Sequence, residues 1–345
     1  MFISVIVPVR NEEKHIGEVL DALTSQKITG AFEVLVIDGQ STDRTVQIVQ
    51  EYCGKYPNVR LFDNPKRLSS VARNIGVKNA KGDAVLIVDG HCIISDDNML
   101  ANVVKAFEES GADCLARPQP LEMQNATVIQ WAIASARRSP LGHNPNSFIY
   151  SDKAQFSPAS SAAIAYRKSV FEKVGYFDET FDACEDVEFN TRCDKAGLKC
   201  WFDPAIAVRY VPRNSIKGLA YQLYRYGRGR MRLFRKHPET FSWSMFGLGA
   251  FVAYVIFIFC LLFSFVSASI ICGYADEHTV FPVFFVMTYG VLAVYIFAVS
   301  LESLRLSFTD LCVPPSMSPK LPLVFIAIHF GFGWGIVREF FRRNY

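Results

Sequence analysis

Apolar residues along the first 212 positions occur in short runs of strand length that alternate with stretches of helical periodicity. The runs are ISVIVPV at 3–9, FEVLVIDG at 32–39, VRLFDN at 59–64 and DAVLIVDG at 83–90. Helices are expected to begin near Glu12, Thr42 and Ser69. Strands rich in Val and Ile on both faces and separated by helices indicate a mostly parallel, Rossmann-like sheet that is covered on both sides. The fold class is therefore α/β.

The pattern changes completely after residue 240. Residues 240–275 contain no Asp, Glu, Lys, Arg or His, and a membrane span needs about 20 apolar residues. We expect transmembrane helices at about 246–272 and 279–301, and a third at about 321–337. The third segment is short and contains His329, so a re-entrant or interfacial helix is the alternative. A span is favoured.

A basic segment precedes the first span. Residues 209–239 contain nine Lys and Arg residues but only one acidic residue, and such a bias marks the cytoplasmic side. We therefore expect a cytoplasmic domain at 1–212, a basic juxtamembrane or interfacial helix at 213–240 and a multi-pass membrane domain at 241–345. The plasma membrane is the expected location.

The three-span arrangement has one difficulty. It would place Arg338, Arg342 and Arg343 outside the cytoplasm, against the same rule. The overall charge of only +3 conceals this basic segment, because the rest of the chain is net acidic. The expected partner of the basic segment is anionic lipid and not nucleic acid. The nine cysteines include no C-x-x-C pair, which is typical of reduced thiols in a cytoplasmic domain.

Polar groups gather where the expected strands end. They are Pro8 to Glu12 after the first strand, Asp38 after the second, and Asp89-Gly90-His91 after the fourth. Ligands of parallel sheets bind at the carboxyl ends of the strands, so these groups are expected to share one crevice. The absence of a G-x-G-x-x-G or Walker-type loop from the sequence argues against a dinucleotide or P-loop site.

Five segments of the sequence resemble motifs of one known family, and they occur in the same order as in that family. They are VIVPVRNEE at 5–13, VIDGQSTDRT at 36–45, ARNIGVKNAKGD at 72–83, VDGH at 88–91 and VGYFDETFDACEDVEFNTRCDKAGLK at 174–199. The family is the inverting family 2 glycosyltransferases, which have the GT-A fold. The resemblance covers most of residues 3–205.

The resemblance implies a donor-nucleotide site at the strand ends. Its residues would be Pro8, Arg10, Glu12, Asp38, Arg73 and Asp89. Asp38 would contact the base of the nucleotide, Pro8 and Glu12 would line the same pocket, and Arg73 would support it. The donor is expected to be a nucleotide-sugar, and UDP is the nucleotide that the family favours.

The resemblance also implies a divalent metal. Asp89 matches the first acid of the D-x-D motif, whereas His91 stands in place of the second acid. An imidazole ligand suits a first-row ion better than magnesium, so Mn²⁺ is preferred over Mg²⁺. The alternative is that His91 belongs only to the loop and Asp89 acts alone.

Asp186, next to Glu185, matches the catalytic base of the family. A carboxylate that accepts the proton of an incoming hydroxyl contributes about 10²–10⁴-fold in rate. Acidic residues are also favoured in the first turn of any helix, so plain helix capping is the alternative explanation for this pair.

The segment QLYRY at 222–226 resembles the Q-x-x-R-W signature of membrane polysaccharide synthases, with a tyrosine in place of tryptophan. Gln222 and Arg225 lie one helical turn apart. Arg225 or Arg228 could reach the leaving diphosphate, and Tyr226 could stack on an acceptor sugar. The equally weighted alternative is that this segment is simply part of the basic collar.

One GT-A domain followed by about three helices resembles the glucosyltransferases of succinoglycan-type exopolysaccharide assembly. That resemblance implies transfer of glucose to a polyprenyl-diphosphate-linked saccharide at the membrane. Two alternatives stay open. One is a polyprenyl-phosphate glycosyltransferase of the dolichyl-phosphate mannose synthase type, and the other is a non-catalytic, membrane-bound scaffold that binds sugar nucleotides.

Overall fold

The computed structural model describes residues 1–143, 148–272, 280–309 and 319–342. These residues form two compact units, each with its own internal packing. Unit 1 consists of residues 1–124 and 146–211, and unit 2 consists of residues 125–145 and 212–345.

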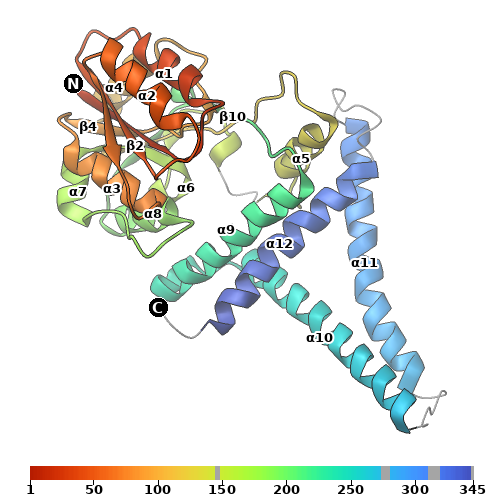
Figure 1. The fold of residues 1–345 in the computed structure, drawn as a ribbon. Coiled ribbons are helices and arrows are strands. Elements are labelled where there is room, and N and C mark those ends of the chain that lie inside the picture. The colour runs from red at the N-terminus through yellow and green to blue at the C-terminus, as the bar shows by residue number, and fades with distance from the viewer. Residues whose placement is uncertain (144–147, 273–279, 310–318, 343–345) are drawn as a thin grey trace. The chain divides into compact units, whose positions relative to one another are not determined.

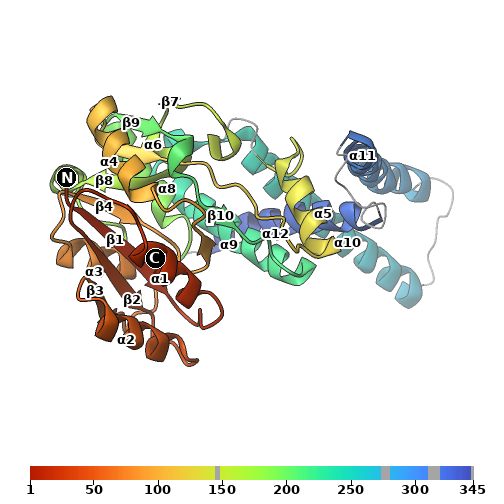
Figure 2. The ribbon, with the colours of Figure 1, turned by 90° about the horizontal axis from the view of Figure 1, so that it is seen from above.

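Unit 1 is built on an eight-stranded sheet with the strand order β3-β2-β1-β4-β8-β6-β9-β7 (Figure 2). The strands β1 to β4, β6 and β9 run parallel, whereas β8 and β7 run antiparallel to their neighbours. The α/β fold with a mostly parallel sheet is confirmed. The strands of the sheet are β1 (Ile3–Val9), β2 (Phe32–Asp38), β3 (Val59–Asp63), β4 (Ala84–Ile87), β6 (Cys114–Ala116), β7 (Gln155–Phe156), β8 (Ala163–Arg167) and β9 (Cys200–Phe202).

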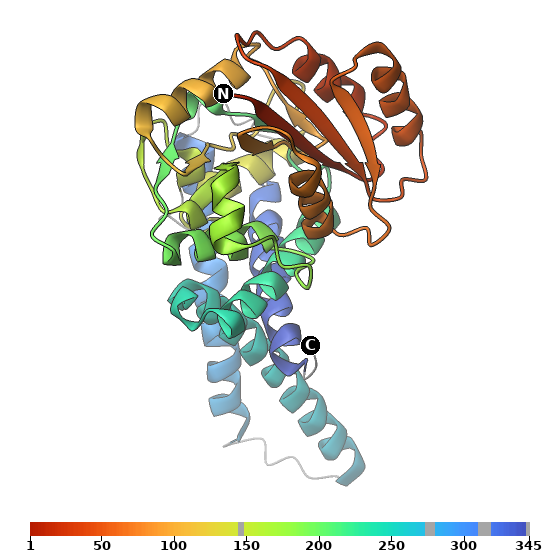
Figure 3. The same ribbon diagram turned by 90° about the vertical axis from the view of Figure 1, so that its left-hand side faces the viewer.

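Helices cover both faces of this sheet (Figures 1 and 3). Alternate residues of β1 and β2 pack against α1 (Ile16–Thr24), α2 (Thr45–Lys55) and α4 (Met99–Ser110). The residues between them point to the opposite face of the sheet. There they pack against α3 (Ser69–Asn79), α7 (Lys168–Val174) and α8 (Glu185–Lys195). Burial on both faces explains why the strands are apolar without alternation.

Three short elements complete unit 1: α6 (Ala159–Ala162), η1 (Phe148–Tyr150) and η2 (Pro204–Ile206). A separate antiparallel ribbon pairs β5 (Cys92–Ile93) with β10 (Arg209–Tyr210). Helices α1 and α2 begin later than the expected Glu12 and Thr42, because the residues before them form interlocked loops. Asn11 has a left-handed φ of 56°, and its side-chain oxygen accepts a hydrogen bond from the Thr42 amide at 2.8 Å.

The described residues of unit 2 form helices joined by short connections. Its helices are α5 (Val128–Arg138), α9 (Ile216–Lys236), η3 (Pro238–Thr240), α10 (Trp243–Cys272), α11 (Val280–Thr309) and α12 (Leu321–Phe341). The expected domain at 1–212 needs a correction here, because residues 125–145 group with the later helices. The reason is apolar burial: Ala132, Ile133 and Ala136 of α5 share one buried cluster with residues of α9, α11 and α12.

Three helices are long and apolar enough to cross a membrane: Trp243–Leu261, Tyr289–Phe308 and Leu321–Phe341. They correspond to the three expected spans. Residue 279, the expected start of the second span, lies outside the described residues. The third helix is 21 residues long, which is longer than the expected 17-residue segment.

Candidate active site

The polar strand ends meet at one edge of the sheet, as expected. The loops after β1 and β2 are joined by the Asn11 amide, which donates to Ser41 Oγ at 2.8 Å, and by the Gly39 amide, which donates to the Val9 carbonyl at 2.8 Å. The loop after β4 reaches the same place. A Cβ at Gly90 would come within 2.7 Å of Val9 Cγ1, so glycine permits this close approach.

Asp38 is buried at the end of β2. One of its carboxylate oxygens accepts from the Ser41 amide at 3.0 Å and the other from Ser41 Oγ, so it fixes the turn after β2. Carboxylate oxygens accept more than one hydrogen bond each, and the expected base contact is compatible with this turn. Pro8 is half-buried and Arg10 is exposed. Their roles in donor binding stay predictions.

Glu12 and His91 come from different loops and form a direct contact. Glu12 Oε1 lies 3.0 Å from His91 Nδ1. A neutral imidazole that donates through Nδ1 has its lone pair on Nε2, and histidines that bind metals are commonly oriented by a carboxylate in this way. The sequence did not suggest this relation between Glu12 and His91.

Asp89 is surrounded by groups that favour its ionised form. Tyr210 donates its hydroxyl to Asp89 Oδ2 at 2.8 Å. Burial opposes ionisation, but the charges of Arg73 and Arg117, the neighbouring His91 and the Tyr210 hydrogen bond hold the pKa of Asp89 below its usual value. Burial and the Asp89 charge in turn raise the pKa of Tyr210, which keeps its hydroxyl proton.

Arg73 connects Asp89 with the acid pair of α8. Its Nη2 lies 3.4 Å from Glu185 Oε1, and Asp186 and Asp89 both act on its charge. Burial raises the pKa of the Glu185 carboxyl group; Arg73 opposes this shift and Asp186 adds to it. Arg73 thus pairs with Glu185 directly, and the expected metal carboxylate and the expected base both act on its charge.

The segment that leads into α8 is held by α3. The side-chain amide of Asn74 donates to the Phe177 carbonyl at 2.9 Å and accepts from the Phe177 amide at 2.9 Å. Cys184, the residue before α8, has a left-handed φ of 62° and provides no side-chain cap. Asp186 accepts a hydrogen bond from the Val187 amide at 2.9 Å. Asp186 therefore also satisfies a backbone amide in the first turn of α8, as the helix-capping alternative expects.

Arg117 was not suggested by the sequence. It follows β6 and is only 1 % exposed, and its Nη2 donates to the Ile87 carbonyl at 3.4 Å. Its Nε and Nη1 have no hydrogen-bond partner among the described residues, although its charge acts on Asp89 and Tyr210. Buried donors without partners are rare in proteins and often mark a ligand site.

The donor set at this edge is suited to a divalent cation. Among the described residues, no three or more His, Cys, Asp or Glu side chains are grouped as a metal cage. The chain instead offers an ionised carboxylate, Asp89, and an imidazole, His91, oriented by Glu12. Two protein donors suit an ion whose remaining positions are filled by substrate oxygens and water.

The residues expected to meet the acceptor lie on α9 in unit 2. Gln222 Oε1 accepts from Arg213 Nε at 3.4 Å. Arg225 and Tyr226 are exposed, whereas Arg228 is largely buried and donates to Glu339 Oε2 at 3.0 Å. Arg228 thus has a structural contact, and the acceptor roles of all four residues stay predictions.

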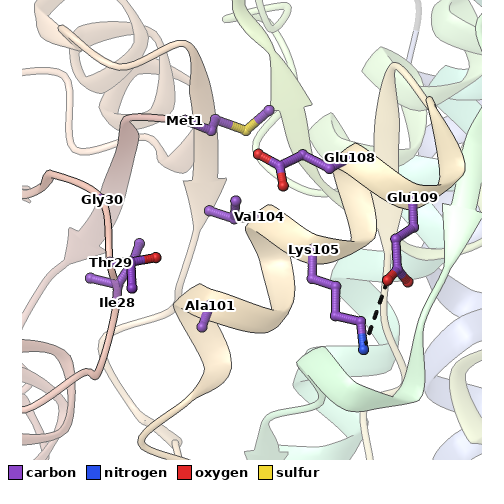
Figure 4. Close-up of a pocket in the computed structure, with 9 residues that line it drawn as sticks. All are labelled: Met1, Ile28, Thr29, Gly30, Ala101, Val104, Lys105, Glu108 and Glu109. Carbon is purple, nitrogen blue, oxygen red and sulfur yellow. Dashed lines mark ion pairs between the residues drawn. The ribbon is translucent and has the colours of Figure 1, made fainter.

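A pocket of about 360 Å³ lies elsewhere in unit 1, between Met1, residues 28–30 and α4 (Figure 4). Met1 and residues 28–30 precede β1 and β2, so this pocket is at the amino ends of the strands. The carboxylate cluster is at their carboxyl ends, and the pocket is therefore separate from the candidate active site.

These features are those of the GT-A fold, which occurs in enzymes that use nucleotide-sugars: a mostly parallel sheet, acidic strand ends and a carboxylate pair on α8. The model of the family described as Glycosyl transferase family 2 matches residues 4–175. The chain belongs to this family and is a glycosyltransferase.

Two relatives and one solved structure illustrate the likeness. The chain is 30% identical over 235 residues to the succinoglycan biosynthesis protein ExoA of Rhizobium meliloti (68% of this chain, 70% of that protein). It is 29% identical over 279 residues to the dolichyl N-acetyl-alpha-D-glucosaminyl phosphate 3-beta-D-2,3-diacetamido-2,3-dideoxy-beta-D-glucuronosyltransferase of Methanococcus voltae (78% and 86%). A mannosyltransferase of Pyrobaculum calidifontis, solved with GDP-Man and Mn²⁺, has a TM-score of 0.55 at 18% identity (98% and 87%).

Proposed function

We propose that this protein transfers a hexose, with inversion, from a nucleotide-sugar to a lipid-linked saccharide during exopolysaccharide or surface glycan synthesis. The observation that carries the proposal is the pairing of Arg73 with Glu185 at 3.4 Å, with the charges of Asp186 and Asp89 both acting on the same guanidinium. The succinoglycan and dolichyl-phosphate-sugar relatives support the acceptor class. From the family resemblance described for the sequence, we propose a UDP-sugar as the donor and glucose as the sugar.

In this proposal Pro8, Glu12 and Asp38 hold the nucleotide at the ends of β1 and β2. The acceptor hydroxyl attacks the anomeric carbon while the bond from that carbon to the phosphate oxygen breaks. Asp186 accepts the hydroxyl proton, and the nucleoside diphosphate leaves with the bonding electron pair. A single displacement inverts the anomeric configuration. Arg73 would orient Glu185, with which it pairs, and its charge would help to keep Asp89 ionised.

A divalent ion on Asp89 and His91 would act as a Lewis acid toward the leaving diphosphate. Glu12 would orient the His91 ring for coordination through Nε2. The imidazole makes Mn²⁺ the preferred ion over Mg²⁺. The Mn²⁺ in the structure of the Pyrobaculum enzyme supports a divalent ion in this fold.

The membrane attachment would bring the enzyme to its acceptor, since a polyprenyl-linked saccharide is confined to the bilayer. We propose a multi-pass plasma membrane protein with a cytoplasmic catalytic unit, followed by the basic helix α9 and the apolar helices. Gln222, Arg225, Tyr226 and Arg228 would then lie near the membrane surface, on the helix that precedes the first span.

The proposed function predicts a specific labelling result. Membranes containing the protein and extracted lipid acceptors should incorporate label from one UDP-sugar, in a panel of UDP- and GDP-sugars, into the lipid fraction. EDTA should abolish the labelling, and Mn²⁺ should restore it better than Mg²⁺. Product found on the bare polyprenyl phosphate would favour a polyprenyl-phosphate glycosyltransferase, and nucleotide binding without any transfer would favour a scaffold.

We further propose that Arg117 binds the donor diphosphate, because a guanidinium suits phosphate oxygens and two of its nitrogens lack partners among the described residues. Arg117→Met should raise the KM for the donor about 10- to 100-fold, the equivalent of one charged hydrogen bond. The thermal midpoint should change little, because the side chain makes only one long hydrogen bond among the described residues.

Arg60→Met is the matched control for Arg117→Met. Arg60 lies on β3 and its Nη2 pairs with Glu33 at 2.6 Å, so its loss should lower the thermal midpoint and leave the KM unchanged. A fall in thermal midpoint for Arg117→Met without a change in KM would assign Arg117 a purely structural role.

A further inference from the structure

Helix α12 packs beside α9, which runs in the same direction (Figure 1). The first turns of α9, near Ala220, contact Gly331 in the middle of α12, and the two helices stay together to their ends. At one end, Leu219 and Leu223 of α9 share a buried cluster with the first turns of α12. At the other end, Arg235 Nη2 donates to the Phe340 carbonyl at 2.8 Å. Both helices contain 21 residues.

The two helices are in backbone contact. A Cβ at Gly227 would overlap the Phe332 carbonyl, and a Cβ at Gly335 would overlap the Tyr224 carbonyl. Near the ends of the helices, the buried Glu339 receives hydrogen bonds from Arg228 at 3.0 Å and from Arg232 at 2.9 Å. Glycine contacts and buried ion pairs make α9 and α12 one packed pair.

The sequence of α9 excludes this pair from the hydrocarbon core. Seven charged residues are spread along α9: Lys217, Arg225, Arg228, Arg230, Arg232, Arg235 and Lys236. Each Lys or Arg at the bilayer centre costs about 2.5–3.5 kcal/mol on an insertion scale. If α12 crossed the bilayer, α9 would have to cross beside it, and several of these charges would lie in the core.

Helix α5 provides a second, independent observation. The Leu141 carbonyl, just after α5, accepts from His329 Nε2 at 2.8 Å, near the middle of α12. Residues 125–145 are joined at both ends to unit 1, so they lie on the same side of the membrane as the catalytic unit. The middle of a crossing helix could not reach them without bringing a polar loop into the bilayer.

We propose that α12 does not cross the membrane and that α9 and α12 together form a platform on its cytoplasmic surface. The ligand of this platform is an anionic lipid bilayer. Exposed apolar side chains line one side of α12 at helical spacing and would enter the acyl-chain boundary: Leu323, Ile326, Trp334 and Phe341. The exposed basic residues of α9, which are Lys217, Arg225, Arg235 and Lys236, would meet the anionic headgroups. Only α10 and α11 then cross the membrane.

This arrangement removes the difficulty that the three-span arrangement has with the positive-inside rule. Arg338 and Arg342 then lie on the same side of the membrane as the basic residues of α9. The apolar composition of α12 is accounted for by two kinds of contact: burial against α5, α9, α10 and α11 on one side, and lipid on the other.

The test uses the full chain in bacterial cells and a membrane-impermeant maleimide. Arg342→Cys should be labelled only after permeabilisation, and a C-terminal GFP fusion should fluoresce while a C-terminal alkaline phosphatase fusion stays inactive. The parent chain measures background labelling of its native cysteines. Labelling of Cys at position 342 in intact cells, or an active phosphatase fusion, would overturn the proposal.

The inference rests on the proposed membrane attachment, and a second variant keeps the two apart. A cysteine inserted between α10 and α11 should be labelled in intact cells if these two helices cross. If that cysteine is not labelled, the attachment itself is wrong. If it is labelled together with position 342, the attachment holds and α12 crosses.

Discussion

Asp186→Asn should lower the turnover number about 10²- to 10⁴-fold, because asparagine cannot accept the proton of the acceptor hydroxyl. The amide oxygen can still accept the hydrogen bond from the Val187 amide, so the start of α8 should remain intact. Donor binding should also persist, since none of the proposed nucleotide contacts involves Asp186. Turnover is measured by label transfer to the lipid acceptor, and binding by calorimetry with the nucleoside diphosphate.

Asp83→Asn is the matched control for Asp186→Asn. Asp83 is exposed and precedes β4 at the opposite edge of the sheet, and its carboxylate accepts a surface hydrogen bond from the Phe2 amide at 2.8 Å. This variant should retain the parent turnover. If Asp186→Asn also retains it, Asp186 is not the base, and an acceptor that is already deprotonated, such as a polyprenyl phosphate, becomes the better hypothesis.

The fold of unit 1 could be predicted because its signals are local. Apolar runs bounded by turn residues gave β1 in full and β2 and β3 to within one residue. The strand-end rule then placed Glu12, Asp38 and Asp89 at one edge. The same rule would have found Arg117, since it follows the run CLA at 114–116 and precedes a proline.

Contacts between distant segments gave no comparable signal. Tyr210 bonds to Asp89 across 121 positions of the chain, through a two-residue ribbon that no periodicity marks. Helix α5 has the spacing of an ordinary surface helix, and the sequence does not show that its apolar side packs with helices that follow residue 212. The partners of these segments are fixed only by tertiary packing.

The length and apolarity of α12 indicated a span, whereas our proposal that it lies on the membrane surface rests on the helices packed against it. Hydropathy counts the residues of one helix and takes lipid as the surroundings on every side. In the structure, half of the apolar stretch of α12 is buried inside the protein. The neighbouring helix α9 is strongly basic. A buried apolar helix and a lipid-facing one have the same composition, so the sequence alone could not distinguish them.

Glu339→Gln should destabilise the helical unit by about 3–5 kcal/mol, because it removes the anion that faces two buried guanidinium groups. The expected result is a marked fall in the thermal midpoint of the detergent-solubilised full chain. Glu239→Gln is the matched control, since Glu239 is about half exposed and lies 3.8 Å from His237. Its midpoint should stay close to that of the parent.

The triple replacement Arg228→Met, Arg232→Met and Glu339→Leu separates charge from packing in the α9–α12 pair. Apolar side chains of similar volume can replace a buried ion cluster without loss of stability, because the desolvation cost of the charges disappears with their attraction. The triple variant should therefore regain most of the midpoint that Glu339→Gln loses. If it stays as unstable as Glu339→Gln, the ion pairs themselves hold α9 on α12. Recovery would show that the glycine contacts at Gly227 and Gly335 are sufficient to keep the two helices together at the membrane surface.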